Sequence, residues 1–155
     1  MENNYVLKMW GKLKSMPFGG KLMAMAIARQ APYFKTVGAT VIDIVPHQSQ
    51  VLLTKRRKIE NHIGTVHVIA ICNGLELAMG TMAEASIPKH LRWIPKGMSL
   101  DYTAKAGSDI RCVAEVAASD WQPGDLMVKV TAYDRNDVVV VAGTIKLWIS
   151  EKDKK

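Results

Sequence analysis

The residues best suited to chemistry lie in one stretch, "ENHIGTVHVIAICNGLELAMGTMAEAS", at positions 60–86. A polar turn opens the stretch, and an almost wholly apolar run follows it with a carboxylate, Glu76, at its middle. An ionised carboxylate in apolar surroundings must be paired, hydrated or protonated, because its desolvation is costly. A desolvated carboxyl group is also a candidate general base or nucleophile near neutral pH. Glu76 is therefore the first catalytic candidate. The alternative is a structural hydrogen bond across a dimer interface, for instance to Asn61 or to a backbone amide.

The apolar run predicts the element that positions this carboxylate. Residues 65–85 are typical of a long helix that is apolar on nearly every side, and Thr65 is its expected N-cap. At about 100° per residue, one face of this helix gathers several side chains. They are Asn73, Glu76 and Gly80, with Thr81 beside them. A curved antiparallel sheet can cover such a helix only in part, so we expect a second copy to cover the rest, in a homodimer that can pair further into a tetramer.

The remaining segments predict an α+β protein of one domain. Residues 1–36 have the spacing of one or two helices, and two strands joined by a short turn follow from Val37. After Pro88 the pattern alternates with period two and predicts about four antiparallel strands, the last two forming a hairpin that turns at residues 135–137. We expect one domain over 1–155, with a helical extension at 1–36, a core at 37–150 and a solvated tail at 151–155.

Composition limits the classes of function. The formal net charge is +7, with basic groups at 55–58 and 89–96, and this charge suits nucleic acid or the phosphates of a nucleotide-bearing thioester. Nucleic acid ranks last, because few aromatic residues are interleaved with the basic ones. Cys72 and Cys112 have no metal-ligand spacing and are interpreted as reduced core residues, and we expect no metal site. With no apolar run of membrane-spanning length and no secretion signal, we expect a cytoplasmic protein that does not bind membranes.

Two segments carry a resemblance to a known family. "NHIGTVHVIAICNGLELAMG", followed by "PKGMSLDYTAKAGSDIRCVAEV", resembles the hotdog-fold acyl-CoA thioesterases of the phenylacetate-pathway type. It resembles still more an uncharacterised hotdog group often described as possible thioesterases. In the thioesterases, a turn of the form Asn-x-x-Gly-x-x-His-Gly-Gly leads into a central helix that carries an Asp or Glu. Asn61, Gly64 and His67 match the turn, and Glu76 falls at the acidic position.

The resemblance implies a fold, a reaction and roles for several residues. The implied fold is the hotdog fold over roughly 37–150, a curved antiparallel sheet wrapped around a long helix. The implied reaction is hydrolysis of an acyl-CoA-type thioester at a dimer interface, with coenzyme A entering only as part of the substrate. By position, the backbone amide of Val68 polarises the thioester carbonyl, Glu76 attacks it or activates water, and Asn61 orients the carbonyl or the water.

The same resemblance suggests which residues bind substrate and where this chain departs from the pattern. The expected substrate-binding residues are Gly64, His67, Gly80 and Thr81, together with Arg57 and Lys96 for phosphates. Alternatively, Arg57 and Lys96 are simply exposed basic residues that bind no substrate. Val68 and Ile69 replace the two glycines of the family's turn, and a β-branched side chain there can restrict access of the thioester. A non-catalytic hotdog module that binds acyl-CoA or fatty-acyl ligands therefore stays open, as does, less strongly, a dehydratase.

Overall fold

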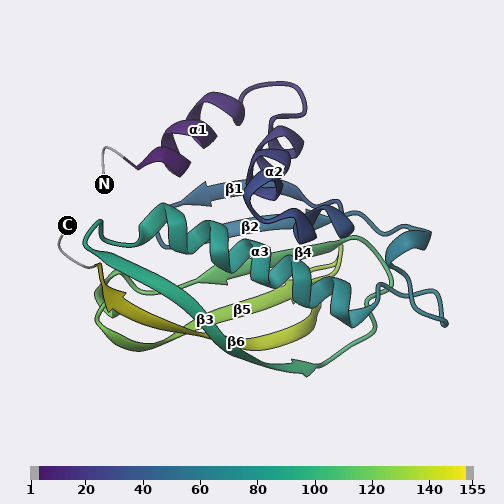
Figure 1. Cartoon of the computed structure of the whole chain (residues 1–155). Helices are drawn as coiled ribbons and strands as arrows, with labels where there is room; N and C mark the ends of the chain where they lie inside the picture. Colours follow the sequence, from purple (N-terminus) through teal and green to yellow (C-terminus); the bar gives the residue numbers. More distant parts are fainter. Residues whose placement is uncertain (1–3, 153–155) are drawn as a thin grey trace.

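The structure is a computed structural model, and it describes residues 4–152 of the chain (Figure 1). Two N-terminal helices, α1 (Tyr5–Leu13) and α2 (Gly19–Gln30), precede a short 3-10 helix, η1 (Pro32–Thr36). The other elements are β1 (Thr40–Val45), β2 (Gln48–Leu53), η2 (Arg57–Ile59), α3 (Val68–Ser86), β3 (Leu91–Tyr102), β4 (Ile110–Glu115), η3 (Ala118–Asp120), β5 (Gly124–Tyr133) and β6 (Val139–Glu151). The predicted order of helices, two strands, a long helix and four strands is thus confirmed.

The N-terminal helices are fixed by local sequence signals and by one buried tryptophan. The Asn4 side chain caps α1 by accepting from the amide of Leu7, at 3.1 Å. The Trp10 side chain is buried, and its indole N–H donates to Asp43 on β1 at 3.2 Å. Helix α2 ends at Gln30, two residues before Pro32, because proline cannot continue a helix. These contacts hold both helices against the rest of the domain.

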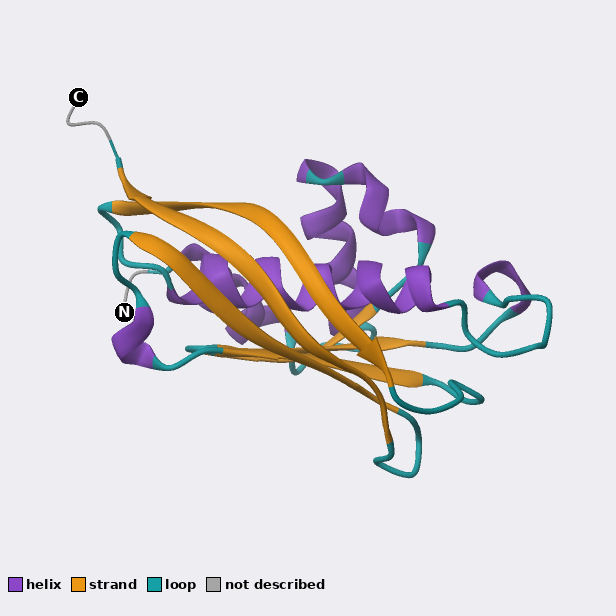
Figure 2. Cartoon of the chain, turned by 90° about the horizontal axis from the view of Figure 1, so that it is seen from below, coloured by secondary structure: helices purple, strands orange, loops and turns teal. Residues whose placement is uncertain are grey.

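The six strands form one antiparallel sheet in the order β1-β2-β4-β5-β6-β3. Figure 2 shows the strands curving across the length of α3. Edge strand β3 carries a bulge between Pro95 and Gly97, where its register against β6 shifts. At Gly143 of β6 a Cβ atom would collide with the backbone oxygen of Ser99 on β3. Glycine at 143 therefore allows the two strands to run close together.

Helix α3 is the centre of the core. It packs mainly on β2 and β4, and its inner side chains, such as Leu75 and Ala78, are fully buried. Gly74 lets the helix approach the sheet, since a Cβ atom there would lie 2.9 Å from both Cys112 Sγ and Leu53 Cδ1. Helix α2 packs on β1, and α1 contacts both α2 and α3. A long central helix wrapped by a curved antiparallel sheet is the hotdog fold, so the predicted fold is confirmed.

Three sequence expectations meet different outcomes in the described residues. The N-cap of α3 is His67 and not Thr65, because the turn before the helix runs two residues further than predicted. Helix α3 has the length and mean hydropathy of a membrane span, but 61% of its apolar window is buried in the domain, as in the core helix of a soluble protein. The expected tail lies mostly outside the described residues; within them, β6 extends to Glu151.

Candidate functional site

The turn before α3 is built around the side chain of Asn61. Its Oδ1 accepts from the amides of Ile63 and Thr65, both at 3.1 Å, and its Nδ2 donates to Thr65 Oγ1 at 2.8 Å. Gly64 has a φ of 73°, a left-handed conformation. Glycine adopts this conformation without steric cost. Because an amide group carries two N–H donors, one Nδ2 hydrogen of Asn61 remains for a ligand. Asn61 and Gly64 together fix the path of the chain into the helix.

The first turn of α3 leaves one backbone donor unused. His67 Nδ1 accepts from the amide of Ile69 at 3.1 Å, and the His67 carbonyl accepts from Ala70 and Ile71 at 2.9 and 3.2 Å. The amide of Val68 has no acceptor among residues 4–152. It lies at the positive end of the helix dipole, where an oxygen that gains negative charge is stabilised. The Val68 side chain is partly buried and packs against the core.

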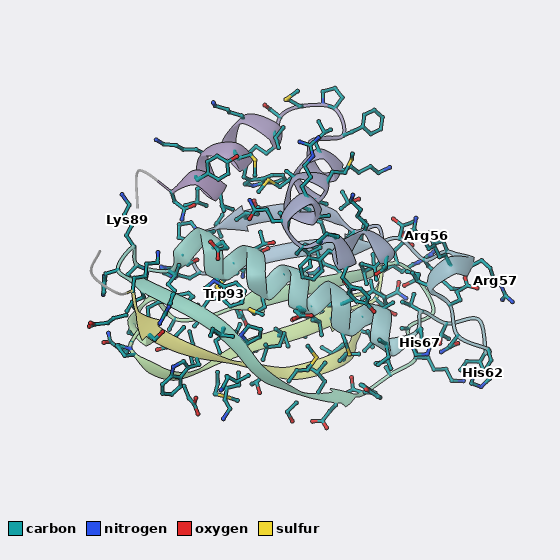
Figure 3. The ribbon with its side chains drawn as sticks, in the orientation of Figure 1. Arg56, Arg57, His62, His67, Lys89 and Trp93 are labelled. Atoms are coloured by element: carbon teal, nitrogen blue, oxygen red, sulfur yellow. The ribbon has the colours of Figure 1, made fainter. Side chains whose placement is uncertain are left out.

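This end of α3 borders a recess of about 480 Å³. Besides Asn61, His67 and Val68, the lining includes His62, Ile63, Thr65, Tyr102, Lys105 and Val141. Figure 3 shows Arg57, His62 and His67 at the same end of α3. The Arg57 side chain is almost fully exposed, and within residues 4–152 it pairs only with Glu60, at 3.8 Å. Arg57 is therefore available to an anion in solvent, although, like Lys96, it lines neither this recess nor the groove that holds Glu76.

Glu76 lies in a second hollow, a groove of about 680 Å³ on another part of α3. We call it the Glu76 groove; its walls come from α1, α2, α3 and β3. The lining includes Tyr5, Val6, Met9, Met23, Ala26, Ile27, Phe34, Glu76, Leu77, Met79, Gly80, Thr81, Glu84, Ile87, Lys89, Trp93, Pro95 and Lys152. The Glu76 side chain is half-buried, and no group among residues 4–152 hydrogen-bonds or pairs with its carboxylate. An unpaired carboxylate beside an apolar groove is free to act on a ligand.

The predicted face of α3 is only partly the wall of this groove. Gly80 and Thr81 line it with Glu76, although the Thr81 hydroxyl donates to the Leu77 carbonyl at 2.8 Å and is satisfied within the helix. Asn73 is buried beneath η1 instead. Its Nδ2 donates to Thr36 Oγ1 at 3.3 Å, while its Oδ1 has no hydrogen-bond partner in the described part of the chain. Lys96 is exposed on β3 and borders neither hollow.

Within one chain the two parts of the predicted site are separate. Val68 and Glu76 are eight residues apart on a straight helix, which places them about 12 Å apart along its axis. One thioester carbonyl cannot touch both the Val68 amide and the Glu76 carboxylate of the same chain. A site that uses both groups must therefore draw them from two copies.

Helix α1 and Trp93 are parts of the site that were not predicted from the sequence. The Trp93 indole N–H donates to Glu84 Oε1 at 2.8 Å, which fixes the ring as a wall of the Glu76 groove. The sequence did indicate that α1 and α2 pack on another surface, because their apolar residues recur at helical spacing and must be buried. Local patterning does not say which surface that is.

The cysteines show no sign of reactivity. Both are free thiols, and Cys112 is fully buried. Burial raises the pKa of the Cys72 thiol, and it raises the pKa of Cys112 well above the usual range, with nearby Cys72 adding to the effect. Within the described part of the chain, no group of three or more His, Cys, Asp or Glu residues is placed to hold a metal ion.

Comparison with known proteins identifies the family. Residues 19–149 match the family described as a domain of unknown function, DUF4442, and the chain belongs to this family. A crystal structure known as genomics APC5556 is 40% identical, with a TM-score of 0.84, and the match covers 96% of this chain and 99% of that one. No curated protein matches the chain.

More distant solved structures share the fold. A Pseudomonas aeruginosa protein of unknown function, named a probable thioesterase, is 19% identical with a TM-score of 0.75, and the match covers 88% of this chain and 99% of that one. A thioesterase from Haemophilus influenzae is 7% identical with a TM-score of 0.73, covering 92% and 97% of the two chains. At these identities the likeness establishes the hotdog architecture that these proteins share with this chain.

Proposed function

We propose that this protein is a thioesterase that hydrolyses an acyl-CoA-type thioester in a site shared by two copies of the chain. The observation that carries the proposal is the half-buried, unpaired carboxylate of Glu76 in a groove on a largely apolar helix. The unused amide of Val68 at the start of the same helix supports it, because thioester hydrolysis needs a donor for the developing oxyanion. The names of the hotdog neighbours, several of them thioesterases, agree with this reaction.

An exposed apolar strip favours pairing of two copies. Past its bulge, β3 turns Met98 and Tyr102 to the same side as Ile145 and Val141 of β6, the side on which α3 lies. Met98 and Tyr102 are exposed, as is Ile69 of α3. The outer edge of β3 has no paired strand within residues 4–152. A second copy on this strip would bury apolar surface and cover an open sheet edge.

Two-fold symmetry would then join the separated halves of the site. In a symmetric dimer, residue i of one copy faces residue j of the other, and the reverse also holds. Cys72 lies midway between Val68 and Glu76 on α3. If the axis passes beside Cys72 and the two helices run antiparallel, Val68 of each copy faces Glu76 of the other. This arrangement supplies each of two sites with one amide donor and one carboxylate.

The proposed chemistry uses each group once. The thioester carbonyl accepts a hydrogen bond from the Val68 amide of one copy, which stabilises the tetrahedral oxyanion. Glu76 of the other copy takes a proton from water as the water oxygen bonds to the carbonyl carbon, or attacks that carbon itself to form an anhydride that water then hydrolyses. The carbon–sulfur bond breaks, and the thiol leaves with a proton. Arg57 and Lys96 are proposed contacts for the phosphates of the thiol carrier, with no metal or separate cofactor involved.

A direct test is thiol release from a panel of acyl-CoAs by the purified protein and by its Glu76→Gln variant. Glutamine keeps the size of the side chain but cannot act as a base, so we expect a loss of about 100-fold or more in kcat. Circular dichroism should show an unchanged fold. Thiol release at the wild-type rate by Glu76→Gln would remove Glu76 from the mechanism.

The second candidate is a non-catalytic module that binds acyl-CoA or fatty-acyl ligands. The observation that favours it is the pair Val68-Ile69 where the thioesterases have two glycines. Calorimetry with an acyl-CoA thioether, which has no hydrolysable ester bond, separates the two functions. Binding of the thioether without any turnover of the matching thioester would establish the binding module instead.

A further inference from the structure

We propose that the Glu76 groove takes an uncharged acyl chain of medium length, and that the N-terminal helices α1 and α2 limit that length. The proposal deepens the proposed function and rests on it for one assignment, the reacting carbonyl beside Glu76. The groove has a volume of about 680 Å³. This size is usual for small-molecule sites. The groove is built partly from residues 1–36, which lie outside the hotdog core expected from the sequence.

The floor of the groove is open because α3 carries a glycine there. A Cβ atom at Gly80 would meet only the Trp93 ring, 3.6 Å away, so the helix leaves free space between Leu77 and Glu84. The hydrogen bond from Trp93 to Glu84 fixes the indole ring, which forms one side of the groove. From Glu76 to Glu84 the helix advances about 12 Å, comparable to an extended octanoyl or decanoyl chain.

The opposite wall comes from α1 and α2. Met9 presents a flexible thioether, which adapts to apolar ligands, and the small side chain of Ala26 leaves room beside it. Met23 is fully buried and supports this wall from within the core. Helix α1 is held in place at both ends of this wall. The Asn4 side chain donates to the Glu84 carbonyl at 2.8 Å, and Trp10 is buried against β1. The wall is therefore part of the folded domain and can limit the length of a bound chain.

The charges at the groove favour a neutral occupant. Two carboxylates, Glu76 and Glu84, lie on its walls, and like charges repel strongly where water is partly excluded. A fatty acid with its carboxylate beside Glu76 is disfavoured, whereas the uncharged carbonyl of a thioester is not. Lys89 and Lys152 border the far end, where Lys152 Nζ donates to the Lys89 carbonyl at 3.0 Å. The apolar part of the groove thus ends at a basic, water-exposed rim.

The test compares chain-length selectivity in variants of the full-length protein. Ala26→Leu adds bulk to the α2 wall, and Met25→Leu is the matched control, because Met25 is exposed on the same helix and does not line the groove. We measure kcat/KM for butyryl-, octanoyl-, decanoyl- and palmitoyl-CoA, and the Kd of decyl- and butyl-CoA thioethers by calorimetry. Ala26→Leu should lower the decanoyl-to-butyryl ratio of kcat/KM, and the corresponding affinity ratio, at least tenfold. Met25→Leu should match wild type.

A second variant and the thioether measurements distinguish a failure of the groove proposal from a failure of the thioesterase function. Tyr5→Ala removes a 71% exposed side chain from the α1 wall, so it should fold normally and still weaken decyl-thioether binding several-fold relative to butyl. If no acyl-CoA is hydrolysed but the thioether ratio shifts as expected, the thioesterase function fails and the groove proposal stands. If ratios in folded Ala26→Leu and Tyr5→Ala equal those of wild type, or if neither thioether binds, the groove proposal is wrong.

Discussion

The amide of Val68 is an unusual chemical group, because it can be removed without disturbing the helix that carries it. Proline is well tolerated at the first position of a helix, where its missing N–H has no intrahelical acceptor. His67 has a φ of -62° and a ψ of 132°. This extended backbone is the conformation that a residue before proline prefers. The chain therefore permits a substitution that deletes one backbone donor and little else.

We predict that Val68→Pro lowers kcat for thioester hydrolysis by about 100-fold or more, the typical effect of losing one oxyanion donor. Val68→Ala is the matched control, because it trims the side chain but keeps the amide. Steady-state kinetics of thiol release and thermal unfolding of both variants check the prediction. Equal kinetics for Val68→Pro and Val68→Ala would show that the amide takes no part.

The two glycines inside α3 should respond oppositely to alanine. At Gly80 an added methyl group meets only Trp93 at an ordinary distance, so the higher helix propensity of alanine should stabilise the fold by about 0.5–1 kcal/mol. At Gly74 the methyl group would lie 2.9 Å from buried atoms of Cys112 and Leu53. We expect this overpacking to cost about 1–3 kcal/mol. Urea unfolding of both variants measures the difference. A stabilised Gly74→Ala variant would contradict the packing described at this position.

The candidate residues could be located from the sequence, but their grouping could not. Glu76, Gly80 and Thr81 share a wall of one groove, as their helical spacing predicts. Asn73 has the same spacing, yet η1 covers it, because the covering of a helix face depends on distant segments. Thr65 satisfies the pattern of an N-cap but is engaged by Asn61, and His67 takes that position. Spacing defines a helix face, whereas tertiary packing decides which part of it a ligand can reach.

At the level of elements, α1 depends on one side chain for its position. Trp10 buries its ring between α1 and the rest of the domain and donates to Asp43. The existence of the N-terminal helices and of the strand pairs was predictable, since both follow from local periodicity. Their docking over the groove was not, because it depends on contacts between residues far apart in the sequence.

We predict that Trp10→Ala costs about 3–5 kcal/mol of unfolding free energy, the usual range for removing a buried tryptophan side chain. Trp148→Ala is the matched control, because Trp148 is 43% exposed on the outer side of β6 and should cost much less. Urea unfolding at one fixed protein concentration makes the comparison, since self-association would shift both midpoints. Similar losses for the two variants would mean that Trp10 does not anchor α1.

For the whole molecule, the apolar strip predicts self-association. An aspartate at Met98 would place a charge in the middle of the proposed interface, so Met98→Asp should shift the protein toward monomers. Met127→Asp introduces the same charge at an exposed position on the outer side of β5 and should leave the assembly unchanged. Sedimentation velocity of the three proteins measures the assembly state and shows whether dimers pair into tetramers. A wild-type protein that sediments as a monomer would end the shared-site proposal.

Mixing two inactive chains tests whether each site is shared. In a dimer of one Glu76→Gln chain and one Val68→Pro chain, one site has both defects and the other has neither. Random exchange of subunits makes half of the dimers mixed, so we expect about one quarter of wild-type activity to return. Each variant alone provides the background rate. If activity does not return although mass spectrometry detects mixed dimers, both groups cannot act across the interface.

The bulge in β3 separates two tasks within a single strand. Before it, Trp93 and Pro95 face α3 and line the groove; after it, Met98 and Tyr102 face the same side and form the exposed strip. The extra residue, Lys96, reverses which sequence positions point inward, so both halves present their apolar side chains to one side of the sheet. A mutation on one side of the bulge leaves the inward and outward alternation of side chains on the other side unchanged. Ligand preference and assembly can consequently change independently over evolutionary time.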